Sequence, residues 1–202
     1  LSVPKSYFAH FYAVGSLVNG AVWATGWPCA PHPALACLFQ AHLLRRLYES
    51  HAVHVSNPTA TMPLQVYAGG LAHYVMAPLS LGGGTGGAPA LAAVVFVAAN
   101  AVQHAAHRHL ASLRKHGTTV AAGVYKAPTS PLFALVVCPH YTAEIVLYAA
   151  LWAARPSLTT ATLAAWVVCN LAITARRTLA WYASKDLGGF PGRRKAVLPW
   201  VL

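Results

Sequence analysis

The chain has 202 residues, of which 57% are hydrophobic and 8% are charged, and its mean hydropathy is +0.50. This composition excludes an ordinary soluble domain, in which about 25% of the residues are charged. The formal net charge of +11 could indicate nucleic-acid binding, but the basic residues gather at the ends of apolar segments, as they do in membrane proteins. We therefore expect an all-α integral membrane protein that contacts membrane lipids, with no nucleic acid among its partners.

Six apolar segments are candidates for membrane helices, which need about 20 residues to cross the hydrocarbon core. In chain order they cover 8–27, 34–50, 61–81, 88–107, 132–154 and 157–178. The second segment is short and ends in charged residues, and the sixth runs into basic residues, so the pattern does not fix its end. Together they predict a multi-pass bundle of about six helices, in a single domain over residues 1–202.

The start of the chain and its connecting segments carry further signals. No basic segment with a cleavage site precedes the first apolar segment, so we expect no signal peptide, and the start at Leu1 rather than Met leads us to expect that the chain is part of a longer one. The glycine-rich stretch "LGGGTGGAPA" (81–90) lacks the lysine and Ser/Thr of a phosphate-binding P-loop, so it predicts a turn between two helices. The polar stretch 107–131 predicts the longest loop outside the membrane.

Basic residues are distributed unevenly between the two ends of the predicted helices. The connections near 28–33, 82–89 and 155–157 carry only Arg155, and the opposite ends carry three basic clusters. By the positive-inside rule, these clusters lie on the cytosolic side. Their members are Arg45 and Arg46; Arg108, Arg114, Lys115 and Lys126; and Arg176, Arg177, Lys185, Arg193, Arg194 and Lys195.

Polar side chains recur at three- and four-residue spacings in three of the segments, so each set shares one helix face. Such groups either hydrogen-bond across helices as structural glue or mark a functional site. Because all three sets lie toward the basic ends of their helices, we expect one pocket open to the cytosol, suited to a phosphate-bearing ligand. The sets are His42, Arg45 or Arg46 and Glu49; Gln103 and His107, with His104 beside them; and His140 and Glu144.

A metal site is a competing interpretation of the histidines. The stretch "HAAHRH" (104–109) is similar to one histidine box of membrane desaturases and hydroxylases. Those enzymes need several such boxes, because a two-metal site requires many ligands, and the other histidines form no second box. The four cysteines show no paired spacing either. We therefore predict neither a metal site nor a disulfide.

Several stretches, taken in order, resemble the polyprenol reductase branch of the steroid 5α-reductase family. They are "VPKSYFAHFY" (3–12), "LLRRLYES" (43–50), the Gln103/His107 segment with "LRKHG" (113–117), "CPHYTAEI" (138–145) and "FPGRRKAVLPWVL" (190–202). The resemblance spans nearly the whole chain. It implies an NADPH-dependent enzyme of the endoplasmic reticulum membrane that reduces a carbon–carbon double bond conjugated to a carbonyl, with a cofactor pocket facing the cytosol.

In this branch the implied substrate is the α-isoprene unit of a long-chain polyprenyl lipid, on the route to dolichol and protein glycosylation. The aldehyde, polyprenal, is the expected form, because hydride adds to a β-carbon only when a carbonyl accepts the charge. The alternatives are a steroid 5α-reductase, a trans-2-enoyl-CoA reductase, and a non-enzymatic membrane scaffold or transport subunit. The "CPH" before Tyr141 and the Gln103/His107 pair favour the polyprenol branch over the steroid branch.

The resemblance also implies which residues form the site. It places Arg45, Arg114 and Lys126 at the cofactor phosphates, with a contribution from the C-terminal cations, whose alternative role is attraction to anionic lipid. Glu144 would orient the nicotinamide as a hydrogen-bond acceptor, with His140 beside it. The implied cofactor-binding residues are Arg45, Gln103, His107, Arg114, Tyr125, Lys126, His140, Glu144, Tyr182, Arg194 and Lys195.

The implied catalytic residues are His42, Glu144 and Tyr182. His42 matches a tyrosine that contacts the steroid carbonyl in the steroid branch, so we expect it to donate a hydrogen bond to the developing enolate oxygen. The chain departs from the family pattern at Leu179, where polyprenol reductases generally carry a histidine. It also lacks the N-terminal region in which the steroid branch has a substrate-binding glutamate.

Overall fold

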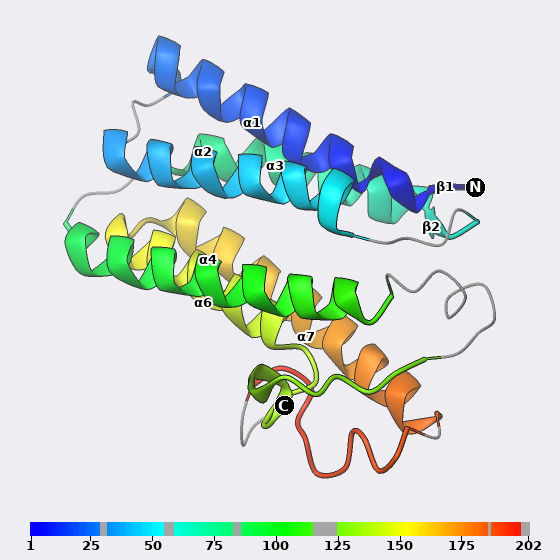
Figure 1. Ribbon diagram of the computed structural model, residues 1–202. Helices are drawn as coiled ribbons and strands as arrows, with labels where there is room; N and C mark the ends of the chain where they lie inside the picture. Colours follow the sequence, from blue (N-terminus) through cyan, green and yellow to red (C-terminus); the bar gives the residue numbers. More distant parts are fainter. Residues whose placement is uncertain (29–31, 55–58, 83–85, 115–124, 186, 199–202) are drawn as a thin grey trace.

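The computed structural model describes residues 1–28, 32–54, 59–82, 86–114, 125–185 and 187–198. Within these ranges the chain folds into six α-helices, and each of them covers most of one predicted apolar segment (Figure 1). The predicted helical character is therefore confirmed. The helices are α1 (Phe8–Thr25), α2 (Pro33–Tyr48), α3 (Leu64–Ser80), α4 (Pro89–Ser112), α6 (Pro139–Ala154) and α7 (Leu158–Ala183).

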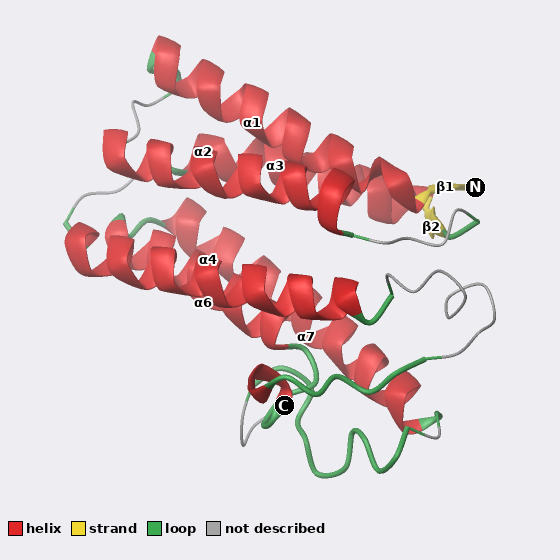
Figure 2. Cartoon of the chain, in the orientation of Figure 1, coloured by secondary structure: helices red, strands yellow, loops and turns green. Residues whose placement is uncertain are grey.

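The expectation of a purely helical chain needs a small correction (Figure 2). Strand β1 (Ser2–Pro4) pairs with β2 (Thr61–Pro63) in an antiparallel ladder, and Lys5 N donates to Ala60 O over 2.8 Å. This pairing joins the start of α1 to the start of α3. Three single turns complete the structure: the 3₁₀ turns η1 (Lys5–Tyr7) and η3 (Pro131–Phe133), and the π-helical turn η2 (Glu49–Val53), which continues α2.

Three helix boundaries differ from the predicted segments. The segment predicted to begin at 132 becomes helical only at Pro139, because proline is accepted in the first turn of a helix but not in its interior. Before it, Val137 N donates to Lys195 O over 2.8 Å, so the chain is extended there. Helix α4 continues to Ser112, past the predicted end at 107, and α7 continues to Ala183, past 178. The predicted loop 107–131 is therefore shorter, and residues 115–124 lie outside the described ranges.

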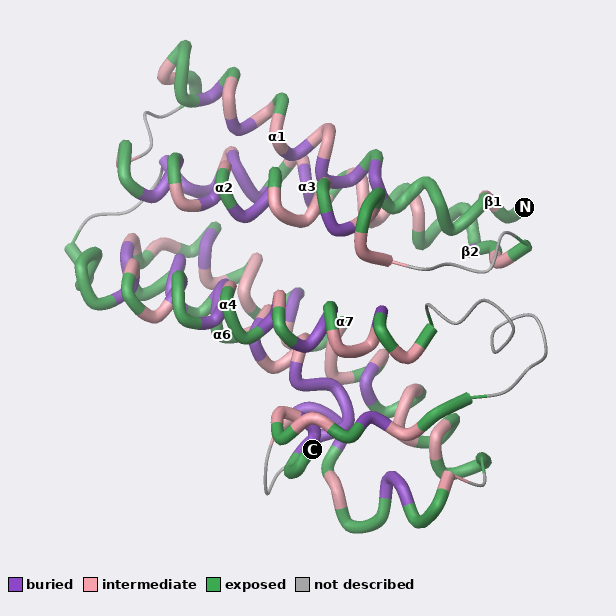
Figure 3. Tube along the Cα trace, in the orientation of Figure 1, coloured by how far each residue is buried: buried purple, intermediate pink, exposed green. Residues whose placement is uncertain are grey.

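The six helices form two layers that follow one another along the chain (Figure 1). Helices α1, α2 and α3 form the first layer and α4, α6 and α7 the second. Packing within the first layer is close at Gly70 of α3, where a Cβ atom would lie 2.6 Å from the Phe11 ring of α1. Between the layers, the ring of Phe39 meets that of Tyr148. Buried residues lie along the helix sides that face one another (Figure 3).

Successive helices run antiparallel, so the ends that carry the basic clusters gather at one end of the bundle (Figure 1). We call this the basic end; it includes the C-terminal ends of α2, α4 and α7 and the N-terminal end of α6. Arg155 lies at the opposite end. Among the described helices, α4 and α7 are long and apolar enough to cross a membrane. That the other four also cross remains a prediction.

Candidate functional site

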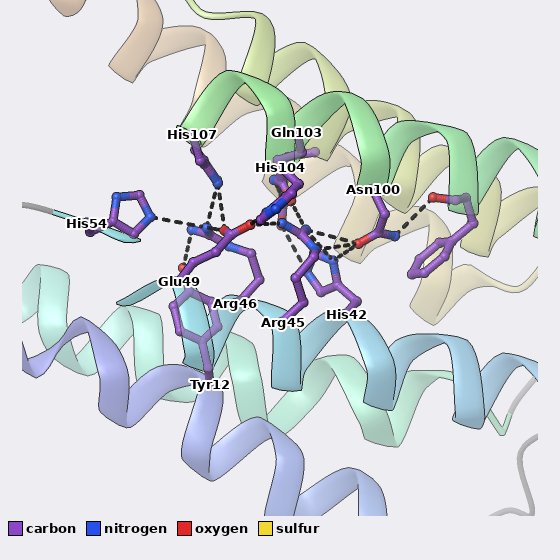
Figure 4. A network of polar contacts seen from close by, with 12 residues as sticks. Tyr12, His42, Arg45, Arg46, Glu49, His54, Asn100, Gln103, His104 and His107 are labelled. Carbon is purple, nitrogen blue, oxygen red and sulfur yellow. Dashed lines mark hydrogen bonds and ion pairs between the residues drawn. The ribbon is translucent and has the colours of Figure 1, made fainter. Parts of the chain in front are cut away.

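A network of polar side chains fills the space between the two layers, near the basic end (Figure 4). Side chains from α2 and η2 reach toward α4, and side chains from α4 reach back toward them. The three polar sets predicted from spacing therefore do converge. The first layer contributes Tyr12, His42, Arg45, Arg46, Glu49 and His54, and the second contributes Asn100, Gln103, His104, His107, His140 and Glu144.

Glu49 is the central anion of this network. Its side chain is completely buried and accepts hydrogen bonds from both Arg45 and Arg46. From the second layer, Nδ1 of His104 lies 2.6 Å from Oε1 of Glu49, and Nδ1 of His107 lies 2.8 Å from Oε2 of Glu49. A carboxylate surrounded by so many donors stays ionised in spite of its burial. Glu49 therefore joins the two layers and neutralises buried cations.

Arg46 fills the position that a metal ion would need. Ligand atoms of Glu49, His54 and His107 lie within 4.8 Å of one another, but Nη1 of Arg46 contacts all three, at 2.8 Å from His107 Nδ1 and 3.4 Å from His54 Nε2. Burial, and then the charge of Arg46, lowers the pKa of His54 to about 4, so its ring is neutral near pH 7. The guanidinium also donates to Tyr12 over 2.6 Å. A permanent cation thus occupies this cluster.

Arg45 leads from this anion toward the second carboxylate. All three of its nitrogens have protein acceptors: Nη1 donates to Glu49, Nε donates to Asn100 over 3.2 Å, and Nη2 donates to Asn100 and to Gln103. The amide nitrogen of Gln103 in turn donates to Glu144. A phosphate at Arg45 would have to displace one of these partners. Arg45 thus holds the site together from within.

Glu144 is the more accessible carboxylate of the two, with 14% of its side chain exposed. Its Oε2 accepts from Gln103, and its Oε1 lies 3.9 Å from Nε2 of His42, beyond hydrogen-bond distance. That nitrogen of His42 is buried without a partner, and so is Nδ1 of His140. These atoms leave hydrogen-bonding capacity that a bound ligand can satisfy.

A second polar contact joins the layers further from the basic end. Nε2 of His73, on α3, lies 2.7 Å from the hydroxyl of Tyr148, which is one helical turn beyond Glu144 on the same face of α6. The Tyr148 ring meets Phe39 edge to face, and Phe39 stacks on His42. The hydroxyl of Tyr148 therefore lies in the neighbourhood of the His42 and Glu144 side chains.

The other predicted site residues lie around the network at the basic end, in or beside the loops. Arg114 follows α4 and is exposed, as are Tyr125 and Lys126, and the Tyr125 ring meets Trp181 at 4.7 Å. Tyr182, on α7, packs against Phe190. The predicted site therefore divides into a buried core and a rim.

Arg194 and Lys195 belong to the same rim. Arg194 Nε donates to Phe133 O over 2.7 Å, and its guanidinium lies over the Phe190 ring. This arginine lines a cavity of about 400 Å³ between the segment 127–134 and the segment 187–190. Lys195 is exposed, and its backbone bridges to Val136. The C-terminal segment is thus anchored beside the start of α6.

Sequence reasoning missed Asn100, whose side-chain oxygen contacts both His42 and Arg45. The signal for it was present, because residues 100, 103 and 107 follow the three- and four-residue spacing of one helix face. Glu49 was placed on the shared face of its helix, but its complete burial and its four partners could not be read from that spacing.

Sequence comparisons relate the chain to one family of known proteins. A family profile described as 3-oxo-5-alpha-steroid 4-dehydrogenase matches residues 87–202, which include the whole second layer. A polyprenal reductase of Caenorhabditis elegans is 29% identical over 100% of this chain and 80% of its own length. Polyprenal reductase 1 of Arabidopsis thaliana is 28% identical over 99% and 82%, and a polyprenal reductase of Saccharomyces cerevisiae is 30% identical over 91% and 69%.

Proposed function

Because this chain belongs to the steroid 5α-reductase family, in its polyprenal reductase branch, we propose that it reduces the α-isoprene double bond of polyprenal with NADPH. As a member of this branch, it is an oxidoreductase of the membrane that acts on a carbon–carbon double bond. The proposed setting is the endoplasmic reticulum, with the basic end toward the cytosol and the product on the route to dolichol.

The observation that carries this proposal is the polar site between the layers, enclosed in an otherwise apolar bundle. Unpartnered nitrogens of His42 and His140 and an oxygen of Glu144 are available in its buried part, and a primary amide such as that of nicotinamide offers both N–H donors and a carbonyl acceptor to such groups. Cations for phosphates lie at the same end, at Arg114, Lys126, Arg194 and Lys195. The residues present therefore fit a phosphorylated nicotinamide cofactor.

The protein's task in this proposal is binding, orientation and the exclusion of water. When bound, the cofactor supplies the hydride. Glu144 and His140 orient the nicotinamide end, Gln103 holds Glu144 in position, and Arg45 fixes Gln103 from the first layer. The rim residues Tyr125 and Tyr182, with the cations around them, cover the phosphates. The apolar surfaces between the helices receive the isoprenoid chain.

A test of this function compares substrates and cofactors in membranes that contain the protein. We expect NADPH, and not NADH, to support loss of the α double bond of polyprenal, followed by mass spectrometry of the lipid product. Polyprenol, an enone steroid and a trans-2-enoyl-CoA serve as competing substrates. Reduction of the steroid or the enoyl-CoA in place of polyprenal would contradict the proposed substrate. Absence of NADPH binding would contradict the proposed cofactor.

Tyr148 is our candidate for the hydrogen-bond donor to the aldehyde oxygen. Nδ1 of His73 is buried without a partner, and a buried lone pair is tolerated more readily than a buried N–H. His73 then carries its hydrogen on Nε2 and donates to Tyr148, which leaves the hydroxyl hydrogen of Tyr148 free for the substrate. Such a donor stabilises the negative charge that develops on the oxygen.

We expect Tyr148→Phe to lower kcat for polyprenal by about 100-fold, the usual effect of removing one oxyanion donor. The dissociation constant of NADPH should stay within about twofold of that of the unmodified protein, because the hydroxyl does not contact the cofactor in this proposal. His73→Phe is the matched variant, since it frees the hydroxyl without removing it, and it should reduce kcat less. Equal kcat in the Tyr148→Phe variant and the unmodified protein would exclude this role.

A further inference from the structure

The amide of Asn100 can adopt only one orientation in this structure. Its nitrogen donates to Phe96 O, one turn earlier in α4, over 2.9 Å. Its oxygen faces two donors of Arg45, Nε at 3.2 Å and Nη2 at 3.0 Å. A reversed amide would point its N–H groups at a guanidinium, which has donors only. The oxygen of Asn100 is therefore the atom that faces His42.

This orientation decides which nitrogen of His42 carries hydrogen. Nδ1 of His42 lies 2.8 Å from the Asn100 oxygen and 3.4 Å from Nη2 of Arg45. The oxygen is the nearer of the two, and two acceptors at 2.8 Å would repel each other, so we assign the hydrogen to Nδ1. In a neutral imidazole the other nitrogen, Nε2, then presents a lone pair. His42 is 2% exposed, and its ring stacks on Phe39, which fixes the plane of the ring.

The lone pair of Nε2 faces the free oxygen of Glu144 across 3.9 Å, and Nε2 has no hydrogen-bond partner. Neither atom brings a hydrogen, and the distance is too long for a direct hydrogen bond. It does allow one donor group to reach both atoms from a position between them. The charged side chains around His42 are Glu144 from α6 and Arg45 and Arg46 from its own helix, whereas α4 presents the uncharged Asn100 and Phe96.

We propose that Asn100 is a positioning residue that fixes His42 in its Nδ1–H form, and that Nε2 of His42 and Oε1 of Glu144 together bind one N–H or O–H donor. The identity of this donor rests on the proposed function: it is the primary amide of the nicotinamide. A carbonyl oxygen, which only accepts, is rejected from this position. The role of His42 is then that of an acceptor toward the cofactor, where sequence reasoning expected a donor to the enolate oxygen. Tyr148 remains available for that oxygen.

The form of His42 can be measured without any substrate. Nitrogen NMR of protein labelled at its histidine nitrogens, with His42→Gln to identify the His42 signals, should show hydrogen on Nδ1. Asn100→Leu, which keeps the size of the side chain but removes the acceptor, should move the hydrogen to Nε2, because Glu144 is then the nearest acceptor. Asn100→Asp keeps an acceptor and should keep the hydrogen on Nδ1. Hydrogen on Nε2 alone in the unmodified protein, or no change in Asn100→Leu, would overturn the proposal.

Cofactor binding gives a second, independent measurement. In the acetylpyridine analogue of NADPH a methyl group replaces the amide nitrogen, so it offers no N–H donor. The unmodified protein should bind NADPH about 10- to 100-fold more tightly than this analogue, which is the usual effect of one hydrogen bond to a charged group. In Asn100→Leu the ratio of the two dissociation constants should be smaller, and in Asn100→Asp it should be the same as in the unmodified protein.

The same ratio in Asn100→Leu and in the unmodified protein would contradict the role of Asn100. If the unmodified protein bound neither cofactor, the proposed function would fail, whereas the NMR result on His42 would still decide whether Asn100 fixes its form. The two failures are therefore distinguishable.

Discussion

Replacement of Glu49 by Gln is expected to prevent stable folding. The change removes the anion between Arg45 and Arg46 and leaves two buried guanidinium groups without the negative charge that balances them. Removal of one partner from a buried ion pair costs about 3–5 kcal/mol, a large share of the roughly 5–15 kcal/mol by which a native protein is stable. The measurement is the yield of monodisperse protein in detergent and its thermal unfolding.

Glu144→Gln is the matched control, because the same chemical change is made at a carboxylate that is partly exposed and has no arginine partner among the described contacts. A second variant, Glu49→Gln combined with Arg46→Met, removes one cation together with the anion and should recover part of the stability. If Glu49→Gln unfolded at the same temperature as the unmodified protein, Glu49 would not be the residue that holds the layers together.

Glu144→Gln is expected to abolish most of the cofactor affinity while the protein stays folded. Gln103 can still donate to the new amide oxygen, but the new amide nitrogen points toward Nε2 of His42 and fills the position proposed for the nicotinamide. Loss of a hydrogen bond to a charged acceptor corresponds to a weakening of about 10- to 100-fold. Titration of purified protein with NADPH gives the dissociation constant, and turnover of polyprenal should fall with it.

The control for this result is thermal unfolding without cofactor, which should differ little between Glu144→Gln and the unmodified protein. Added NADPH should raise the unfolding temperature of the unmodified protein and leave that of the variant nearly unchanged. Unchanged NADPH affinity and unchanged turnover in a folded variant would remove Glu144 from the cofactor site.

Much of the fold follows from the sequence because apolar length and charge placement act locally. The six helices lie within the predicted segments or extend them by a few residues, and the basic ends gather as the charge pattern predicts. The exception at Pro139 depends on a contact with the distant C-terminal segment, in which Val137 and Cys138 bond to the backbone of residues 195 and 196. Hydropathy alone cannot distinguish such an extended apolar segment from the first turns of a helix.

The candidate site was predictable only in part, because spacing reports which residues share a face and not how two helices are rotated against each other. The convergence of His42, Gln103 and Glu144 could be predicted, because each lies on the polar face of its helix and at a similar distance from the basic end. That every nitrogen of the Arg45 guanidinium donates to Glu49, Asn100 or Gln103 did not follow, since it depends on the height of α2 relative to α4. The donor or acceptor character of His42 likewise depends on one amide oxygen of a neighbouring helix.

The order of the two layers along the chain has a consequence for biosynthesis. Helices α1, α2 and α3 leave the ribosome before α4, so Arg45 and Arg46 are already part of the nascent chain while Gln103, His104 and His107 are still unsynthesised. Glu49 belongs to the same early part of the nascent chain and contacts both arginines within one turn of helix. The first half of the protein thus brings one anion for its own two arginines, and the second half adds the remaining polar partners once it is synthesised.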